Sequence, residues 1–481
     1  MSVEVIQEMK GNVKNKQKET KSCYESLKTL FNSHRMIMII VFIAILLDNM
    51  LLTAIVPIVP KILSDGDKIS KIIENETSGS ECNDGVFNLR TSKINNTDFI
   101  RCFNQSNKTY HEMNHEEHSN EIGLMFAIKP IVQLICNPFI GPITNRIGYS
   151  IPMFTGLIIM FVSTMIFAFG NNYYLLLVAR AVQGMGSACS SVSGMGMLAT
   201  YYTDEKERGR AFAFALSGLA LGVLIGPPYG GVTFQFISKE APFLILAGLT
   251  LFDGILQLIT LKPSVKRENQ KGTSLLRLLM DPYILIATGA ITFGNLGMAI
   301  LEPTLPLWMK IKMNSEEWEQ GVSFLSGSVS YLIGTNIFGP ISHRIGRGNS
   351  AGIGLLICCF SLIGLPFSTK VEHLIAPMFG LGFAIGMIDS SMMPIMGYLV
   401  DLRHVAIYGS VYAIADVAFC VGFAAGPLLG TVLQRALGFK WMLWITAIIS
   451  FVYAPLTIFL RKPPKRDDAS DQVVVSESTN M

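Results

Sequence analysis

Charged side chains are scarce in this sequence. Asp, Glu, Lys and Arg account for 15% of its 481 residues, whereas about 25% is usual in soluble domains. Hydrophobic residues account for 50%, and apolar stretches of about 20 residues, each long enough to cross a bilayer as a helix, recur along the chain. The shortage of charge excludes an ordinary soluble domain and predicts a protein that crosses a membrane many times.

Signals of enzymatic chemistry are also missing. The sequence has no phosphate-binding loop, no cluster of metal ligands and no nucleophile with a neighbouring base. We therefore predict no enzymatic activity, no metal site and no bound cofactor. His111, His115 and His118 lie close together, but solvated histidines are the simpler interpretation in an acidic, polar stretch.

The apolar stretches predict twelve membrane-spanning helices. Their expected ranges are 36–60, 122–143, 151–169, 173–199, 210–234, 241–261, 282–309, 320–341, 351–368, 374–400, 407–433 and 440–461. We therefore expect an all-α membrane protein built as two six-helix bundles, over residues 36–261 and 282–461.

Lys and Arg collect in four segments between and around these spans. The segments are the tail 1–35, the linker 262–281, the loop around Arg344 and the tail 462–481. Such segments remain in the cytosol by the positive-inside rule. The first tail also lacks the apolar region of a signal peptide. Both termini and the linker are therefore expected on the cytosolic side.

The long loop on the opposite side, about residues 61–121, carries four glycosylation sequons. They begin at Asn75, Asn95, Asn104 and Asn107. Glycosylation acceptors face the lumen or the exterior, so the sequons favour the same orientation. Cys82 and Cys102 lie in this loop and either form a local disulfide or remain two free thiols.

Two halves of the chain repeat one another. The motif Gly141-Pro-Ile-Thr-Asn-Arg146-Ile-Gly148 recurs as Gly339-Pro-Ile-Ser-His-Arg344-Ile-Gly346, and Gly226-Pro227 recurs as Gly426-Pro427. One six-helix unit is therefore present twice. Duplicated bundles place a substrate site near the membrane midplane between the halves, and rocking of the halves opens it to each side in turn.

These motifs resemble those of the major facilitator superfamily. Gly141 to Gly148 resembles its loop signature, and Gly226-Pro227 resembles the element typical of antiporters in the fifth span. The motif arginine, Arg146, can bridge acidic groups and helix C-termini across a cytosolic gate. The Gly-Pro element lets two helices approach closely and bend, which makes it a candidate hinge.

Seven ionisable groups fall inside the predicted spans. They are Asp48, Lys129, Arg180, Asp253, Glu302, Asp389 and Asp416. Each costs roughly 2.5–3.5 kcal/mol at the centre of a helix, so they should face the bundle interior and find partners there. With Asp253 left aside, four carboxylates face two cations. This surplus predicts an interior that takes up protons or a cationic substrate, whereas static ion pairs between helices are the alternative.

Spacing predicts how some of these groups meet. Lys129, Gln133 and Asn137 step by four residues and form one polar face of a helix. A pair between Lys129 and Asp416 would join the two halves as a switchable latch. Competition between a proton and an amine for one carboxylate is the simplest chemical basis of antiport. Aromatic side chains could form cation–π walls around an ammonium, namely Phe126, Trp308, Tyr331, Tyr412 and Phe419.

Three segments resemble the vesicular amine transporter family. They are Leu47-Asp48-Asn49-Met50, Gly386-Met-Ile-Asp389, and Tyr408-Gly-Ser-Val-Tyr-Ala-Ile-Ala-Asp416. The run Cys189-Ser-Ser-Val-Ser-Gly-Met is similar to the monoamine branch rather than the choline-ester branch. Further positions match the polar network of the family, namely Asn49, Lys129, Gln133, Asn137, Arg180, Asn295, Glu302 and Tyr331.

The resemblance implies roles for these residues. Asp48 and Glu302 would contact the amine or the catechol, and Asp389 with Arg180 would handle protons and gating. Two positions depart from the family pattern: Phe423 replaces a tyrosine at the substrate site, and Asn314 replaces a cysteine that would form a disulfide with the first luminal loop. The C-terminal tail also lacks a dileucine sorting signal.

The implied function is the exchange of lumenal protons for cytosolic dopamine, serotonin, noradrenaline, histamine or phenolamines, driven by the vesicular proton gradient. The expected location is the membrane of synaptic or secretory vesicles, with a plasma-membrane or endosomal pool. We expect a monomer in the lipid bilayer that binds a cationic amine and protons. We expect no nucleic-acid partner. The alternatives are an acetylcholine transporter, a broad organic-cation or drug–proton antiporter, and a receptor that does not transport.

Overall fold

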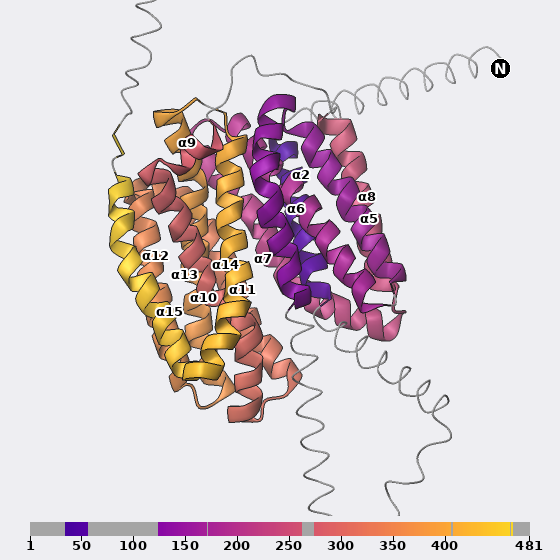
Figure 1. Cartoon of the computed structure of the whole chain (residues 1–481), viewed down its shortest axis with the longest axis vertical. Coiled ribbons are helices and arrows are strands. Elements are labelled where there is room, and N and C mark those ends of the chain that lie inside the picture. The colour runs from indigo at the N-terminus through magenta and orange to yellow at the C-terminus, as the bar shows by residue number, and fades with distance from the viewer. Residues whose placement is uncertain are drawn as a thin grey trace, which may run out of the picture.

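The computed structural model describes residues 34–55, 124–170, 172–261, 274–405, 407–461 and 463–464. These residues form two bundles of long helices that stand side by side (Figure 1). The N-terminal half contains α2 (His34–Ala54), the helix Leu124–Ile147, α5 (Ser150–Phe169), α6 (Tyr173–Tyr201), α7 (Glu205–Phe236) and α8 (Ala241–Leu261). The C-terminal half contains α10 (Pro282–Met313), α11 (Glu317–Ile345), α12 (Arg347–Gly364), α13 (Val371–Arg403), α14 (Gly409–Leu437) and α15 (Phe439–Tyr453).

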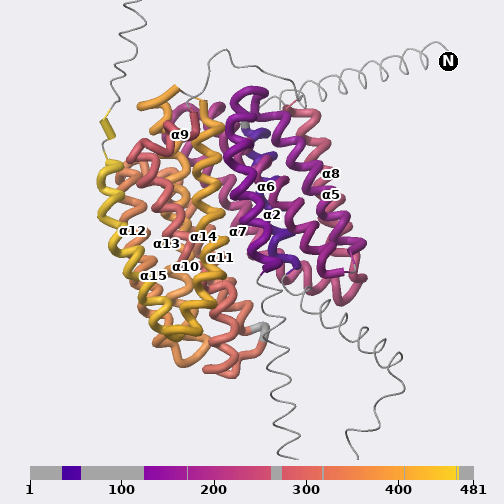
Figure 2. The backbone as a smooth tube through the Cα atoms, in the orientation of Figure 1, coloured from indigo at the N-terminus to yellow at the C-terminus, as the bar shows by residue number. Residues whose placement is uncertain are grey.

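Short elements complete the C-terminal half. The 3-10 turn η2 (Leu365–Phe367) follows α12, and η3 (Ala454–Arg461) extends α15. The short helix α9 (Leu275–Leu279) precedes α10 and lies at the same end of the molecule as the first residues of α2 (Figure 2).

Eleven of the helices in the described part of the chain are long and apolar enough to cross a membrane. The remaining long helix, α11, occupies the eighth predicted span but is richer in serine, including Ser323, Ser326, Ser328 and Ser330. It packs against α13 in its own half and against α7 in the other. Because protein rather than lipid covers much of its surface, α11 can be less apolar than its neighbours.

Several helices extend beyond the predicted spans. Helix α7 begins at Glu205 rather than 210, where the Asp204 side chain accepts hydrogen bonds from the backbone N–H groups of Lys206 and Glu207. Helix α10 continues to Met313 rather than 309 and ends at Asn314, whose φ of 51° is left-handed. The apolar residues mark the part of each helix that lies in the lipid. Capping groups beyond that part determine where the helix begins and ends.

The sequence repeat corresponds to a repeat of helix contacts within each half. Helix α2 packs on α7 as α10 packs on α14. A Cβ atom added to Gly226 would collide with Thr53, and one added to Gly426 would collide with Ala299. Each candidate hinge glycine therefore brings two helices of one half into close contact.

The duplicated loop motifs make contacts between the halves. Gly141 lies against Ala413 and Gly409 of α14, while its counterpart Gly339 lies against Gly209 and Ala213 of α7. The two contacts are equivalent: in each, the motif glycine of one half packs against a helix of the other half. These glycines are needed because each leaves room for the backbone of a helix from the other half.

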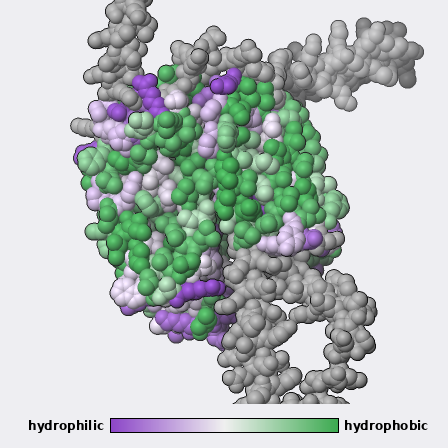
Figure 3. All heavy atoms as spheres, viewed as in Figure 1, coloured by the Kyte–Doolittle hydropathy of each residue, from purple (hydrophilic) through white to green (hydrophobic). Residues whose placement is uncertain are grey.

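Buried apolar side chains form one core that spans both halves and two that mostly do not. The shared core contains Ile40 of α2, Phe212 of α7, Ile284 of α10, Met396 of α13 and Val411 of α14, all near the end that carries α9. At the opposite end, one cluster belongs to the N-terminal half and another almost wholly to the C-terminal half. The face of the molecule seen in Figure 3 is largely apolar, as lipid contact requires. Among the described residues, the apolar core that both halves share therefore lies at the α9 end.

Candidate functional site

The α9 end forms a gate across the path between the halves. Arg208 of α7 donates to Asp401 of α13 at 2.8 Å, and the Tyr408 hydroxyl donates to the other oxygen of Asp401 at 2.5 Å. One layer deeper, Phe212 stacks on Tyr412 with ring centroids 5.3 Å apart. A polar lock therefore covers an aromatic layer at this end.

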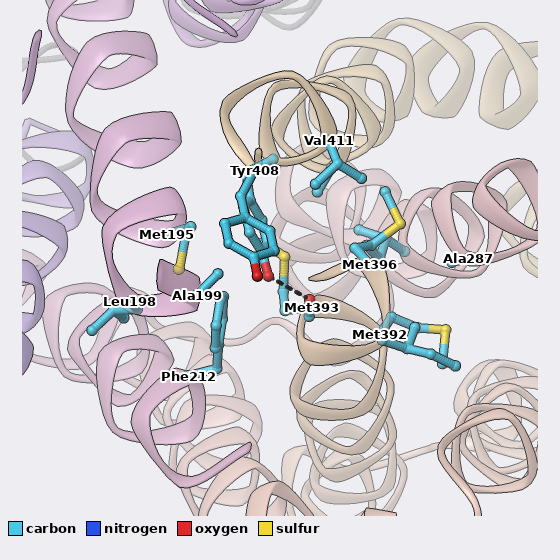
Figure 4. Packing of buried hydrophobic residues seen from close by; sticks show 14 of the residues in the cluster. Met195, Leu198, Ala199, Phe212, Ala287, Met392, Met393, Met396, Tyr408 and Val411 are labelled. Atoms are coloured by element: carbon cyan, nitrogen blue, oxygen red, sulfur yellow. Dashed lines mark hydrogen bonds between the residues drawn. The ribbon is translucent and has the colours of Figure 1, made fainter. Parts of the chain in front are cut away.

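Methionine side chains fill the space around the aromatic layer. Met195 of α6 lies on one side, and Met392, Met393 and Met396 of α13 lie on the other (Figure 4). The Tyr412 hydroxyl donates to the Met393 carbonyl at 3.3 Å, the dashed line in Figure 4. Flexible methionines can fill such a layer in more than one arrangement, which suits a contact that must open.

The gate role expected for the motif arginines Arg146 and Arg344 has no contact to support it among the described residues and stays a prediction. Both side chains are exposed and form no ion pair within the described residues. The gate instead uses Arg208 and Arg347, and Arg347 donates to the Glu205 carbonyl at 2.7 Å. The motif supplies its glycines to the interface, while the ionic contacts come from residues beside it.

Asp48 and Lys129 form an ion pair inside the N-terminal half. Lys129 Nζ lies 2.9 Å from Asp48 Oδ2, with exposed fractions of 6% and 15% for the two side chains. The other oxygen, Oδ1, accepts from the Ser187 hydroxyl at 2.7 Å and from the Gln183 amide at 3.1 Å. Each oxygen of the Asp48 carboxylate is therefore occupied by a donor.

Asp416 crosses from the C-terminal half into the same polar layer. Its Oδ2 accepts from Gln133 at 2.7 Å and Asn137 at 2.8 Å, and its Oδ1 accepts from Ser191 at 2.7 Å. All three donors are neutral and belong to the N-terminal half. A single buried carboxylate therefore joins α14 to α6 and to the helix Leu124–Ile147.

The predicted pair between Lys129 and Asp416 is absent from this conformation, because Lys129 pairs with Asp48 instead. Lys129 and Gln133 lie one turn apart on a single helix face, so the two carboxylates occupy adjacent levels of that face. Sequence spacing identified the face but could not decide which carboxylate the lysine binds.

Arg180 is fully buried and is surrounded by neutral groups. It donates to Gln183 Oε1 and to the Leu52 carbonyl, each at 2.8 Å. Its guanidinium carbon also lies 5.7 Å from the ring centres of Phe126 and Phe167. Arg180 therefore forms no contact with Asp389, with which the resemblance grouped it.

Asp389 lies in the C-terminal half with neutral partners only. It accepts from the Asn295 amide at 3.0 Å and from the Tyr331 hydroxyl at 3.2 Å, and its side chain is fully buried. Within the described residues, no ion pair includes it. Glu302, two turns beyond Asn295 on α10, is exposed and has no polar partner in the same part of the chain.

The following turns of α10 line a cavity. Pro303, Pro306 and Leu307 contribute to it together with Lys310 and the start of α11, and its volume is about 850 Å³. A volume of this order accommodates a small organic molecule. The residues that line it all belong to the C-terminal half, and Glu302 directly precedes the first of them in the sequence but does not line it.

The predicted aromatic wall does not form as one unit. Phe126 covers Arg180, Tyr331 binds Asp389, and Tyr412 belongs to the gate layer. Trp308 stacks on Phe439 at 4.5 Å, within the C-terminal half. Phe419 and Phe423 on α14 are half-buried. The four sequon asparagines, Cys82 and Cys102 lie outside the described residues.

Comparison with known proteins gives this arrangement its family. A family model described as Major Facilitator Superfamily matches residues 37–415 and 292–476. The synaptic vesicular amine transporter of Bos taurus is 50% identical over 465 residues, which cover 91% of this chain and 90% of that protein. The chain belongs to the vesicular amine transporters of the major facilitator superfamily.

Other vesicular transporters are similar to this chain to different degrees. The chromaffin granule amine transporter of Homo sapiens is 50% identical over 91% of this chain and 89% of its own. The vesicular acetylcholine transporter of Tetronarce californica is 38% identical over 89% of this chain and 81% of its own. The crystal structure of the human organic anion transporter MFSD10 (TETRAN) has a TM-score of 0.68 at 16% identity, covering 88% of this chain and 99% of that one. This last match concerns the fold alone.

The vesicular amine transporter fold brings together site residues that sequence reasoning missed. Gln183, Ser187 and Ser191 step by four along α6, so they form a second polar face opposite Lys129, Gln133 and Asn137. Ser187 binds Asp48 and Ser191 binds Asp416, one turn apart. The spacing was visible in the sequence, but small hydroxyl residues are common at helix contacts in membranes and were not counted among the ionisable groups.

Proposed function

We propose that this protein is a proton-coupled antiporter that carries cytosolic monoamines into acidic secretory vesicles by alternating access. The names of its relatives supply the substrate class, because those that are about 50% identical are described as amine transporters of synaptic vesicles and chromaffin granules. The more distant relatives at 38% are acetylcholine transporters, which makes a choline ester the second candidate substrate.

One observation supports the coupling mechanism: the polar layer holds two carboxylates, Asp48 and Asp416, but one cation, Lys129, which pairs with Asp48. While Lys129 forms its ion pair with Asp48, Asp416 has only neutral hydrogen-bond donors among the described residues. A protonated amine that takes Asp48 would release Lys129, and a proton on either carboxylate would release a partner in the same way. Amine and proton thus compete for the same negative charge, which is the requirement for exchange.

The gate supports the alternating part of the proposal. The halves are sealed at the α9 end by Arg208, Asp401 and the Phe212–Tyr412 stack, while Glu302 is exposed toward the other end. With α9 and both termini assigned to the cytosol, this conformation faces the vesicle lumen. Protonation from the lumen would then precede opening of the Arg208–Asp401 contact toward the cytosol.

Reconstituted vesicles test the proposal. Full-length protein in proteoliposomes with an acidic interior should accumulate radiolabelled serotonin or dopamine, and a proton ionophore should abolish accumulation. A competition panel of monoamines, acetylcholine and polyamines then decides the substrate class. Accumulation that persists after the pH gradient is collapsed contradicts proton coupling, whereas preference for acetylcholine would replace the monoamine assignment.

A further inference from the structure

Aromatic rings surround two lysines at the end of the C-terminal half opposite α9. Lys440 Nζ lies 4.4 Å from the centre of the Trp444 ring and 5.5 Å from that of Phe367. Lys312 Nζ lies 4.8 Å from the centre of the Trp308 ring. These five residues, here called the aromatic–lysine cluster, come from the last turns of α10, from η2 and from the start of α15.

The cluster has donors but no anion. Neither lysine forms an ion pair with any residue that the structure describes. Lys312 has one carbonyl partner, that of Pro366 at 3.4 Å. The Trp444 indole nitrogen is buried and likewise lacks an acceptor. Two positive charges therefore lie at one end of the C-terminal half without a negative partner among the described residues.

The position of the cluster favours contact with lipid. Phe367 and the adjacent Trp441 are 60% and 57% exposed, and Trp441 packs edge-on against Trp444 at 5.3 Å. Tryptophan with a neighbouring lysine is typical of the level where the hydrocarbon meets the headgroups. In Figure 3 the apolar surface of this half gives way to hydrophilic residues at its lower edge.

We propose that the aromatic–lysine cluster binds the phosphate of an anionic phospholipid in the leaflet at this end. The two ammonium groups would attract the phosphate, and the exposed faces of Phe367 and Trp441 would contact the acyl chains. A soluble anion would use the lysines but would leave these two rings in water. This site lies apart from Asp48, Asp389 and Asp416 and does not depend on the transport function.

Tryptophan fluorescence tests the proposal, because three of the four tryptophans of the chain (Trp308, Trp441 and Trp444) lie in or beside the cluster. Full-length protein is placed in nanodiscs of phosphatidylcholine that contain an increasing fraction of brominated phosphatidylserine or of brominated phosphatidylcholine. The anionic quencher should act at a lower mole fraction. Lys312→Gln and Lys440→Gln should each weaken this preference about fivefold, since a basic residue near an anionic lipid surface contributes about 1 kcal/mol.

Two further variants keep the result interpretable. Trp444→Phe retains a ring beneath Lys440 and keeps both ammonium groups, so the preference should fall less than with either lysine variant. Lys370→Gln removes a charge at the same end that contacts no ring in the described structure, so it should leave the preference unchanged. Equal quenching by the two lipids, or an equal loss in Lys370→Gln, would overturn the proposal in favour of a general aromatic belt or diffuse surface charge.

Discussion

The two halves treat their principal carboxylates differently. In the N-terminal half, Asp48 has a lysine 2.9 Å away and two neutral donors besides. In the C-terminal half, Asp389 has only the Asn295 amide and the Tyr331 hydroxyl. The halves share a repeat, yet one buried acid is neutralised by the protein and the other is not. The duplicated scaffold therefore gives its two acids different surroundings, and we propose that Asp389 binds a proton in addition to the exchange at Asp48.

The largest expected effect comes from removing the charge that the N-terminal half neutralises. Asp48→Asn should lower amine uptake about 100-fold or more, because it deletes the anion that pairs with a cationic substrate and leaves Lys129 buried without a partner. Asp253→Asn is the matched control: Asp253 is fully buried in α8 with Gln257 as its only partner in the described residues, and uptake should persist. Normal uptake by Asp48→Asn would remove Asp48 from the mechanism.

Substitution of the other acid should separate exchange from pumping. Asp389→Asn should lower gradient-driven uptake about tenfold or more, because Asp389 pairs with no cation among the described residues and a carried proton would be its neutralising partner. Exchange of labelled for unlabelled amine needs no net proton movement and should continue. If both processes fail equally in a stably folded variant, the division of tasks between the halves is wrong.

A double-mutant cycle would sharpen the comparison at the level of stability. Lys129→Met should lower the free energy of unfolding by about 3 kcal/mol, since it leaves one member of a buried ion pair uncompensated. Combined with Asp48→Asn, it should give a coupling energy of about 2 kcal/mol, whereas the cycle of Lys129→Met with Asp416→Asn should give less than about 1 kcal/mol. Thermal unfolding of the purified variants measures both, and the reverse order would place the lysine on Asp416.

A third carboxylate of the C-terminal half lies outside the membrane-spanning segments and has a charged partner. Asp281 caps α10 and accepts from Arg403 at 2.7 Å and His404 at 3.0 Å. Burial raises the pKa of Asp281, but the bonds from His404, Arg403 and the Tyr283 N–H outweigh it and lower the pKa to about 2. An unfolded aspartate titrates near 3.9, so this stabilisation is complete above about pH 4 and is lost as the pH falls toward 2.

Asp281→Asn should therefore cost about 2 kcal/mol of stability at neutral pH and progressively less below pH 4. Thermal unfolding across this range measures the difference between the variant and the unmodified protein. The smallest change of the series is expected between neutral pH and the pH of an acidic vesicle, because the contribution of Asp281 to stability should be the same at both. A contribution that changes between pH 7 and 5 would contradict the lowered pKa.

Much of the architecture could be predicted from residue patterns. Apolar stretches located the helices because lipid imposes a minimum apolar length, and the glycine motifs revealed the duplication because close backbone contact excludes larger side chains. The partner of Lys129 could not be predicted, since Asp48 and Asp416 lie within one helical turn of the same polar face. Trp308 was misplaced for a related reason: periodicity gives the face of a helix but not whether that face meets the other half or the neighbouring helix.

The glycine contacts between the halves have a consequence for the speed of the transporter. Gly141 against Gly409 and Gly339 against Gly209 bring backbone close to backbone, and a hydrogen bond from Asn145 to Ser410 lies beside the first contact. The helices can shift at these points without displacing large side chains, so we expect the barrier to opening to depend strongly on Arg208–Asp401 and the Phe212–Tyr412 stack. The turnover rate should thus respond to changes in those four residues, while the glycine contacts add little resistance to the movement of the halves.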